Sequence, residues 1–395
     1  MHVLIIPSWY PETPEDVDGI FFRQQAQALQ RSGLKIGVTA PLFRSLRGKP
    51  KSIVTGGYGI RHYVEENIPT YVYKSMYFFP RLPLDRTRWV NAGKKLFEHY
   101  VRDHGYPDII HAHCMNFGGV LAHSLHEQTG IPYVITEHST TYARKLIRNW
   151  QWDAMHLSAQ KCASRIAVSK DFCTLLKEIY RGLEWKYIPN ILSAQASESF
   201  DFSTKPQNSH FTFCSVAHLN FKKGFDILLS AFAKVLEKYP DMRLKIGGTG
   251  LAEPQLHEQA KQLNLQDSVS FLGGLQYPDV LKLMRQSDAF VLASRHETFG
   301  VVFIEALAQG LPIIATRCGG PESIVTEENG LLVPTEDIDA LVQAMIDLYE
   351  SRQNYHPEQL RNDCINEFGE ASIVNRITEE YQKALSNNRN SVKNS

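Results

Sequence analysis

The sequence predicts an α/β fold with two doubly wound parallel-sheet domains of similar size. Short apolar runs alternate with helical patterns along most of the 395 residues, which is typical of βαβ units. Residues 193–210 are rich in Ser, Gln, Ala and Asn and interrupt this alternation, so we predict an interdomain linker there. The apolar run Thr212–Ala217 then restarts the pattern. Because ligands of such sheets bind outside the carboxyl ends of the strands, we expect the two domains to face one central cleft.

The first predicted domain, residues 1–192, holds apolar runs that are typical of buried strands: Val3–Ile6, Lys35–Ala40, Asp108–His113, Tyr133–Thr136 and Arg165–Val168. Apolar residues at helical spacing predict helices at Phe21–Arg31 and Val120–Thr129.

The second predicted domain, residues 211–365, repeats the alternation. Its strands are expected at Thr212–Ala217, Arg243–Ile246, Val269–Leu272, Ala289–Ala293 and Pro312–Thr316. Its helices are expected at Phe225–Tyr239, Ala252–Leu263, Tyr277–Gln286, Val301–Gln309 and Ile338–Arg352. Residues 366–386 predict a C-terminal helix that packs back on the first domain, and the polar residues 387–395 predict a disordered tail.

Composition excludes several classes of protein. Forty-two basic residues balance 42 acidic ones, which argues against a protein that wraps nucleic acid. No run approaches the roughly 18 apolar residues that span a bilayer. The start, Met1–Pro7, lacks a basic region and predicts a buried strand rather than a signal peptide. Six scattered cysteines without a C-x-x-C pair exclude a zinc ribbon and fit a reducing, cytoplasmic location.

Charge is unevenly distributed along the chain. Residues 1–190 hold 24 basic and 16 acidic residues, a net charge of +8, and the remainder holds 18 and 26, a net charge of −8. Part of the basic excess follows an aromatic run within Tyr71–Lys95. Aromatic side chains between basic ones suit reversible contact with an anionic membrane, at the inner face of the cell membrane. The alternative is a solvated basic face over ordinary core aromatics.

The strongest motif is Ser294–Ala306. A predicted strand ends near Ala293 and a helix begins near Phe299, whose first N–H groups have no helical partner and lie at the positive end of the helix dipole. Gly300 lets a ligand approach, so the motif is a candidate seat for a diphosphate. Glu297 can reach a sugar, and Glu305 lies about 12 Å further along the helix axis. The pair could therefore bind two parts of a nucleotide sugar; the alternative is an N-capping glutamate and a surface glutamate.

The segment E-T-F-G-V-V-F-I-E-A-L-A-Q-G-L-P-I-I-A-T-R-C-G-G-P-E at residues 297–322 resembles the signature of retaining glycosyltransferases of family four, which have the GT-B fold. Further matching segments are Lys222–Leu228, Ile246–Gly250, Phe271–Gly273, Gly330–Pro334, Ile188–Asn190, Ser8–Pro11 and Gly19–Phe22. The resemblance covers nearly the whole chain and is weakest over residues 43–105. It implies a GT-B protein with an N-terminal acceptor-side domain and a C-terminal domain that binds the nucleotide sugar, both Rossmann-like.

The resemblance also implies roles for individual residues. Glu297 would contact the donor sugar, Glu305 the ribose and Lys223 the diphosphate. A cation there would stabilise the charge of the departing nucleoside diphosphate. The other donor contacts implied are Gly19, His218, Thr249, Leu275 and the residues at the helix start, Phe299, Gly300 and Val301. Lys223 as an ordinary surface lysine is the alternative.

One position departs from the family pattern. Where the family usually carries an arginine after the first strand of this domain, the chain reads Ala217-His218-Leu219. A histidine can donate one hydrogen bond to phosphate but lacks the arginine fork. We therefore expect weaker diphosphate binding, or else a packing role for His218.

In the first domain the resemblance assigns the active-site histidine to His138, so the predicted catalytic residues are His138, Glu297 and Lys223. His111 and His113 alternate along a strand and should point to the same face. Gly19 follows the first strand and lets the backbone approach a ligand. Structural roles are the alternatives for His138, as a residue after a strand, and for Gly19, as a turn glycine.

We expect neither a metal nor a cofactor, because lysine and helix amides take their place in the GT-B type. The D-x-D spellings at Asp16–Asp18 and Asp337–Asp339 do not follow apolar strands. The expected reaction moves a sugar from a UDP- or GDP-sugar to a hydroxyl of a glycan or lipid-linked acceptor of bacterial envelope synthesis. Rival classes are an epimerase or hydrolase of the same fold, a non-catalytic nucleotide-sugar-binding protein and a membrane scaffold. A nicotinamide dehydrogenase would need G-x-G-x-x-G after the first strand, which Pro7–Gly19 lacks.

Overall fold

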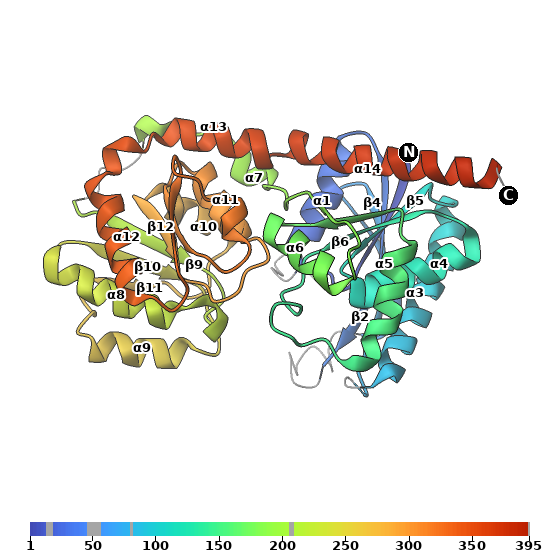
Figure 1. Cartoon of the computed structure of the whole chain (residues 1–395), viewed down its shortest axis with the longest axis horizontal. Coiled ribbons are helices and arrows are strands. Elements are labelled where there is room, and N and C mark those ends of the chain that lie inside the picture. The colour runs from blue at the N-terminus through green and yellow to red at the C-terminus, as the bar shows by residue number, and fades with distance from the viewer. Residues whose placement is uncertain (13–18, 46–56, 80–81, 205–208, 394–395) are drawn as a thin grey trace. The chain divides into compact units, whose positions relative to one another are not determined.

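The computed structural model describes residues 1–12, 19–45, 57–79, 82–204 and 209–393. The chain forms two compact units. The first unit comprises residues 1–168, 173–189 and 373–395, and the second comprises residues 169–172 and 190–372. Each unit is built on a largely parallel sheet flanked by helices (Figure 1). The predicted α/β class with two parallel-sheet domains is confirmed.

The sheet of the first unit has the order β3-β4-β2-β1-β5-β6-β7-β8. All its pairs are parallel except β3–β4. Its strands are β1 (His2–Pro7), β2 (Lys35–Arg44), β3 (Gly59–Glu65), β4 (Ile68–Met76), β5 (Ile109–His113), β6 (Tyr133–Glu137), β7 (Ser164–Ala167) and β8 (Lys186–Tyr187). The inner strands are buried on both faces, and they therefore read as continuous apolar runs in the sequence.

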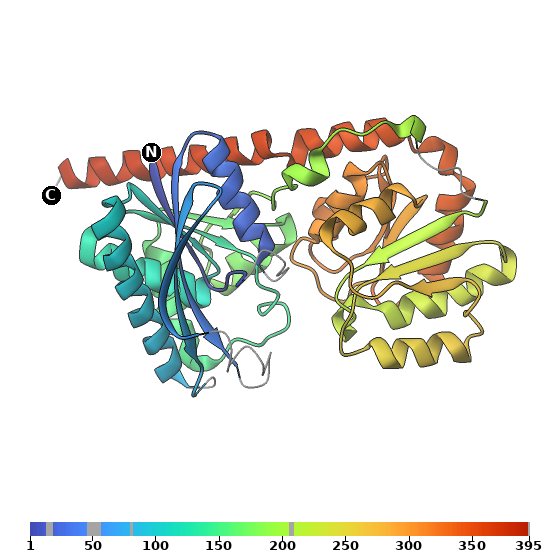
Figure 2. The same cartoon turned by 180° about the vertical axis from the view of Figure 1, so that it is seen from behind.

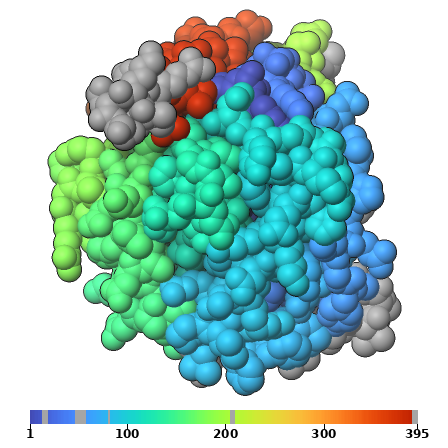
Figure 3. All heavy atoms as spheres, turned by 90° about the vertical axis from the view of Figure 1, so that its right-hand side faces the viewer, coloured from blue at the N-terminus to red at the C-terminus, as the bar shows by residue number. Residues whose placement is uncertain are grey.

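Helices cover this sheet on both sides (Figure 2). They are α1 (Ile20–Arg31), α3 (Pro83–His104), α4 (Val120–Thr129), α5 (Trp152–Lys161), α6 (Lys170–Ile179) and α14 (Glu370–Lys393). Side chains of α3, α4 and α5 form much of one broad face of the unit, shown in blue to green in Figure 3. The central strands β1 and β5 are neighbours although a long crossover separates them, so the switch point of the sheet lies between them.

The sheet of the second unit is entirely parallel and has the order β11-β10-β9-β12-β13-β14. Its strands are β9 (Thr212–Val216), β10 (Arg243–Gly247), β11 (Val269–Phe271), β12 (Ala289–Leu292), β13 (Ile313–Thr316) and β14 (Gly330–Val333). This is the doubly wound order 3-2-1-4-5-6, whose switch point lies between β9 and β12. Residues that follow these two strands are therefore placed to bind a ligand.

The helices of the second unit are α7 (Ala194–Ser197), α8 (Phe225–Lys238), α9 (Glu253–Gln262), α10 (Tyr277–Arg285), α11 (Val301–Ala308), α12 (Ile338–Glu350) and α13 (Pro357–Phe368). Helices α8 and α9 lie on one face of the sheet, and α10 and α11 lie on the other (Figure 1). Helix α8 buries one apolar face and keeps polar residues on the other. Helix α11 is buried along most of its length, which explains its nearly continuous apolar sequence.

Three expectations from the sequence differ from the structure. Residues 68–76, read partly as an interfacial aromatic segment, form the inner strand β4, where Tyr71 and Val72 are buried. The expected linker contains α7 and a short 3₁₀ helix at Phe202–Thr204. Residues 387–393, expected to be disordered, continue α14, because nothing in this polar stretch, which lacks Pro and Gly, stops a helix already formed upstream.

Candidate functional site

The turn between β12 and α11 carries the motif that the sequence singled out. Gly300 precedes α11 with φ +95°, a left-handed conformation that favours glycine. Gly300, Val301 and Val302 are partly exposed, whereas Phe303–Ala308 are buried. The first turn of α11 carries no acidic residue. The amino end of the helix is therefore open and positively polarised, as anion binding requires.

Lys223 and Glu297 form an ion pair beside this helix end. The Nζ atom of Lys223 contacts Oε1 of Glu297, and both side chains are largely buried. The hydroxyl of Ser294 donates a hydrogen bond of 2.9 Å to the same carboxylate oxygen. The structure thus brings together two of the predicted catalytic residues, which lie 74 positions apart in the sequence.

A glycine permits this approach of the two loops. Gly224 follows Lys223 with φ +65°, and a Cβ atom there would lie 1.8 Å from the carbonyl oxygen of Ala293 at the end of β12. Only glycine allows the loop after β9 to lie directly against the end of β12. The packing next to the ion pair therefore requires the glycine that follows Lys223.

Arg295 ties the same two loops together and was not singled out from the sequence. Its guanidinium donates two hydrogen bonds of 2.8 Å to Asp226, two more to Glu336 and one to the carbonyl of Phe221. Although burial opposes ionisation, the hydrogen bonds from Arg295 lower the pKa of Asp226. The bidentate geometry fixes the residues on either side of Lys223 and Glu297.

Glu305 lies further along α11 and is buried. The hydroxyl of Tyr277 donates a hydrogen bond of 2.8 Å to its Oε1 atom. Burial raises the pKa of Glu305 to about 7, and the bond from Tyr277 opposes this rise. Tyr277 begins α10, and nothing in the sequence motif pointed to it.

The remaining predicted donor residues lie along the carboxyl ends of β9, β10 and β12. His218 is exposed just after β9, and Thr249 is exposed just after β10. Leu275 lies against the end of β10, since a Cβ atom on Gly247 would lie 2.6 Å from its Cδ1 atom. Phe299 is buried and packs edge-on against Phe368, so its side chain belongs to the core.

The predicted histidine of the first unit lies in a buried aromatic cluster. The Nε2 atom of His138 is 3.0 Å from Nδ1 of His113, and the rings of Phe21 and Phe22 pack against His138. The rings of His111 and His113 lie 4.3 Å apart, which confirms that they point to the same face. Burial lowers the pKa of His111 to about 3 and that of His113 well below its usual range.

Glu137 is engaged with the backbone around this cluster. Its carboxylate accepts hydrogen bonds from the amides of Met115, His138 and Ser139 and from the hydroxyl of Tyr142. Burial nevertheless raises its pKa. Glu137 therefore positions the residue next to it in the sequence, His138.

Gly19 also lies in the first unit and precedes α1 with φ +81°. A Cβ atom there would lie 2.9 Å from the ring of Trp9. Both the conformation and the space thus select glycine at this position.

Of the two D-x-D spellings, the structure describes only Asp337–Asp339, whose carboxylates serve other contacts. Asp16–Asp18 lie outside the described residues. Asp337 caps α12 through a bond from the amide of Ala340, and Asp339 pairs with Lys234. Among the described residues, no group of three or more His, Cys, Asp or Glu could hold a metal ion. None of the helices that the structure describes combines the length and the apolar composition of a membrane-spanning segment.

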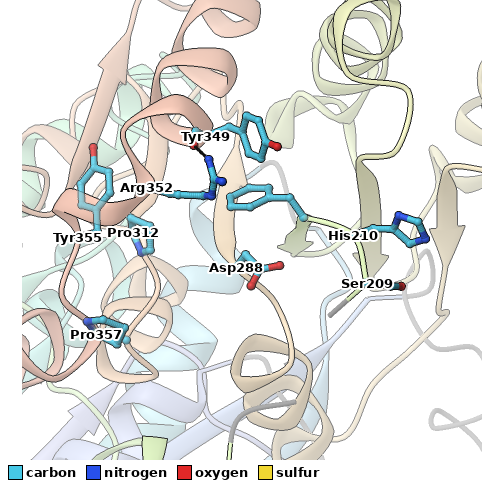
Figure 4. A pocket seen from close by; sticks show the side chains of 10 residues that line it. Ser209, His210, Asp288, Pro312, Tyr349, Arg352, Tyr355 and Pro357 are labelled. Carbon is cyan, nitrogen blue, oxygen red and sulfur yellow. Dashed lines mark hydrogen bonds between the residues drawn. The ribbon is translucent and has the colours of Figure 1, made fainter. Parts of the chain in front are cut away.

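A separate pocket of about 390 Å³ lies at the opposite edge of the second sheet (Figure 4). Phe211, Asp288 and Pro312 line it from the amino ends of β9, β12 and β13. Its charged groups serve the fold: Asp288 accepts from the amide of Thr212, and Arg352 donates to the carbonyl of Tyr349. It is distinct from the residues around α11.

Two α/β units in one chain, each built on a parallel or largely parallel sheet, are the architecture of the GT-B class of glycosyltransferases. The family model for glycosyl transferases group 1 matches residues 197–367, and the model for glycosyltransferase family 4 matches residues 20–193. Together they span most of the chain, which therefore belongs to glycosyltransferase family four.

Individual relatives agree with this assignment. An uncharacterized glycosyltransferase of Methanocaldococcus jannaschii is 28% identical over 254 residues, 59% of this chain and 64% of its own length. One component of the human phosphatidylinositol N-acetylglucosaminyltransferase is 29% identical over 250 residues, 60% of this chain and 49% of its own length. The chain thus matches less than two thirds of the length of these curated relatives.

Solved structures share the fold. The sucrose-phosphate synthase of Thermosynechococcus elongatus superposes with a TM-score of 0.77 at 19% identity, covering 98% of this chain and 100% of its own. Anabaena HepE, in complex with UDP and glucose, gives a TM-score of 0.70 at 20% identity, covering 97% and 100%.

Proposed function

We propose that this protein transfers a sugar from a nucleoside-diphosphate sugar, a UDP- or GDP-sugar, to a hydroxyl acceptor, with retention of the anomeric configuration and without a metal. The observation that carries the proposal is the contact of Lys223 with Glu297 beside the open amino end of α11. A cation, a carboxylate and a helix end in one place match the parts of such a donor, because the cation and the helix end suit its diphosphate and the carboxylate suits its sugar hydroxyls. Anabaena HepE, which shares the fold, was solved with UDP-glucose.

In the absence of the nucleotide sugar, Lys223 and Glu297 each pair with the other instead of with a group of the substrate. Without the donor, the Lys223 ammonium and the Glu297 carboxylate neutralise each other at a buried position, which limits the cost of burying either charge. When the donor binds, the diphosphate takes the place of Glu297 at Lys223, and the sugar hydroxyls take the place of Lys223 at Glu297. The exchange leaves each group paired.

Lys223 and the amides of Gly300 and Val301 then act on the leaving group. As the bond from the anomeric carbon to the phosphate oxygen breaks, negative charge grows on the nucleoside diphosphate. Fixed donors and a fixed cation at that point stabilise the transition state more than the bound substrate, which raises the rate. This chemistry needs no divalent cation.

Retention is proposed to occur by attack on the face from which the phosphate leaves. The acceptor oxygen bonds to the anomeric carbon, and a phosphate oxygen of the leaving group takes the acceptor proton. A covalent intermediate would need a free carboxylate nucleophile. The two conceivable nucleophiles are Glu137 and Glu297. Glu137 already accepts four hydrogen bonds within the first unit, and Glu297 pairs with Lys223, which favours the single-face route.

For the acceptor we propose a lipid-linked or polysaccharide intermediate of bacterial envelope synthesis, used at a membrane surface. Within the described residues of 78–84, four large apolar side chains are about half exposed: Phe78, Phe79, Leu82 and Leu84. Arg86 stacks on Trp150, next to a segment that exposes Leu146, Arg144, Lys145 and Arg148. Apolar and basic groups side by side suit the headgroup region of an anionic membrane. The name of the human relative also refers to a lipid acceptor.

The test begins with a thermal-shift screen of nucleotide sugars, followed by mass detection of products on candidate acceptors. Lys223→Ala and Glu297→Gln should each reduce transfer by at least about a hundredfold while the protein stays folded. The matched control is Lys234→Ala, which removes an exposed lysine–carboxylate pair of the same unit and should leave transfer unchanged. Near-normal transfer by either site variant refutes the site. Donor turnover without an acceptor would instead identify a hydrolase or an epimerase.

A further inference from the structure

A chain of three hydroxyl and carboxyl groups runs from the start of the second unit into the donor site. The hydroxyl of Ser193 lies 2.6 Å from the hydroxyl of Tyr277, and the hydroxyl of Tyr277 lies 2.8 Å from Oε1 of Glu305. The members come from three separate segments: the residue that caps α7, the first residue of α10 and the middle of α11.

The direction of the hydrogen bonds in this chain follows from its two ends. Ser193 accepts a bond of 3.0 Å from the amide of Ala196, so its own proton can be donated to Tyr277. An ionised carboxylate only accepts, so Tyr277 donates to Glu305. Each group thus accepts from one neighbour and donates to the next, and the carboxylate oxygen at the end is held in one orientation.

We propose that Tyr277 is a positioning residue for nucleoside recognition: held by Ser193, its hydroxyl fixes Oε1 of Glu305 and leaves Oε2 to accept the hydroxyls of a ribose. The inference rests on the proposed function, in which Glu305 binds the ribose of the donor. It gives two tasks to residues 275–277 at the start of α10, because Leu275, two residues before Tyr277, is the predicted contact for the rest of the nucleoside. One short segment would then contact the nucleoside and also orient the carboxylate that binds its ribose.

The environment of Glu305 makes this arrangement sensitive to pH. Burial raises the pKa of Glu305 to about 7, and the bond from Tyr277 acts against burial. The nearby charged groups on packed helices are directed elsewhere: Arg285 of α10 to Gln309, and Arg361 of α13 to the carbonyls of Ala196 and Ala308. The ionised form of Glu305 is the one that accepts ribose hydroxyls, so nucleotide affinity should fall as pH drops through about 7.

The variant Tyr277→Phe keeps the ring and removes the hydroxyl. Without its bond, the pKa of Glu305 rises further, and the midpoint of the affinity–pH curve moves to higher pH. A shift of about one unit lowers the ionised fraction at pH 7 by roughly fivefold and has little effect at pH 9. Ser193→Ala leaves the bond from Tyr277 to Glu305 but frees the hydroxyl, so it should move the midpoint in the same direction by less.

A matched control exists in the same unit. Tyr239 also donates its hydroxyl to a glutamate, Glu350, at an exposed position away from α11. The variant Tyr239→Phe therefore removes a tyrosine–carboxylate bond of the same kind and should leave the nucleotide curve unchanged.

The experiment measures binding of UDP and of GDP to the full chain by calorimetry between pH 6 and pH 9, for the wild type and the three variants. The expected result is a loss of about fivefold at pH 7 in Tyr277→Phe that shrinks to less than about twofold at pH 9. A loss that is equal at every pH, or no loss, overturns the inference, since a merely structural role would not move the midpoint. If Tyr277→Phe unfolds, an unshifted Ser193→Ala overturns it. Failure of the wild type to bind either nucleotide overturns the proposed function together with the inference.

Discussion

The Nε2 atom of His138 lies 3.0 Å from the Nδ1 atom of His113 in the first unit. Burial, together with the neighbouring His111 and His138, keeps the pKa of His113 well below its usual range, so His113 is neutral at neutral pH. Two imidazoles that share one hydrogen bond must present one N–H and one lone pair to each other. The tautomer of His113 therefore determines which nitrogen of His138 carries a proton.

Removing this partner should impair catalysis without affecting donor binding. His113→Phe keeps a ring of similar size and should lower the transfer rate by about tenfold or more, since an acid–base or polar contact of His138 depends on its tautomer. Nucleotide affinity, which we assign to the second unit, should stay unchanged in calorimetry. A double-mutant cycle with His138→Phe should give a coupling energy of about 1 kcal/mol or more; strictly additive losses would show that the two histidines act independently.

Because Gly224 lies so close to the end of β12, replacing it should lower the free energy of unfolding of the second unit strongly. Gly224→Ala places a Cβ atom 1.8 Å from the Ala293 carbonyl and adds left-handed strain, so the free energy of unfolding should fall by about 3 kcal/mol or more. Gly273 has a similar φ of +69° and open space around it, so Gly273→Ala should cost only about 1–2 kcal/mol. Urea denaturation of the two variants checks the difference, and equal losses would contradict it.

Glu380 of α14 should make the docking of this helix depend on pH. Its carboxylate is 5% exposed and contacts the Nζ atom of Lys186 and the hydroxyl of Ser164. Burial opposes ionisation, but these bonds lower its pKa below the usual 4.5. A lowered pKa means that the stabilisation is present above pH 4.5 and is lost as pH falls below it.

The matching variant is Glu380→Gln. It should weaken protection of α14 amides from hydrogen exchange at pH 7 by about 1–2 kcal/mol, and the difference from the wild type should vanish near pH 3. Glu379→Gln, one residue earlier and exposed, serves as the control. A difference that persists undiminished at low pH would rule out the carboxylate as its source.

The exposed apolar residues of 78–84 should mediate membrane contact. Phe79→Ser with Leu82→Ser should weaken sedimentation with anionic vesicles by about tenfold or more, since full burial of a large apolar side chain contributes about 1.5–3 kcal/mol and these two are about half exposed. The control is Val64→Ser with Tyr106→Ser, which are more exposed and lie elsewhere on the same unit. Binding by the wild type should also weaken as salt rises, because surface charges are screened. Equal binding by both double variants would contradict the assignment.

The salt effect should be smaller than the basic composition of Tyr71–Lys95 predicts. Arg88 pairs with Asp85 and donates to the carbonyl of Met76, and Arg86 stacks on Trp150. Both guanidinium groups thus contact other parts of the first unit and are less available to an anionic surface. The pair of Arg88 with Asp85 has the i,i+3 spacing of one helix, but the contacts with Met76 and Trp150 could not be read from the sequence, because they join separate elements.

The parts of the candidate site that could be predicted are those encoded by neighbouring residues. A strand that ends near Ala293, a glycine at 300 and an apolar helix from Val301 follow from local pattern, and the structure has each of them. The pairing of Lys223 with Glu297 also follows once the sheet order is known, because β9 and β12 are adjacent at the switch point. Chemistry at strand ends is thus readable from the sequence of a doubly wound sheet.

The parts that could not be predicted depend on side chains that meet only in the folded chain. Tyr277 reaches Glu305 across 28 residues, and Arg295 reaches Asp226 across 69. No spacing rule connects such positions. The strand β4 was missed for another reason: its Tyr-Val-Tyr run is equally typical of a buried strand and of an interfacial segment, and only pairing with β2 decides between them.

The return of the chain to its starting unit has a consequence for biosynthesis. Residues 373–395 complete the first unit, where Tyr381 holds His111 at the base of the histidine cluster. On the ribosome, the strands of the first unit emerge by residue 187 but its helix α14 follows only after the second unit, which is complete at residue 372. Nascent chains halted before residue 373 should therefore present a folded second unit and an incomplete first unit to chaperones.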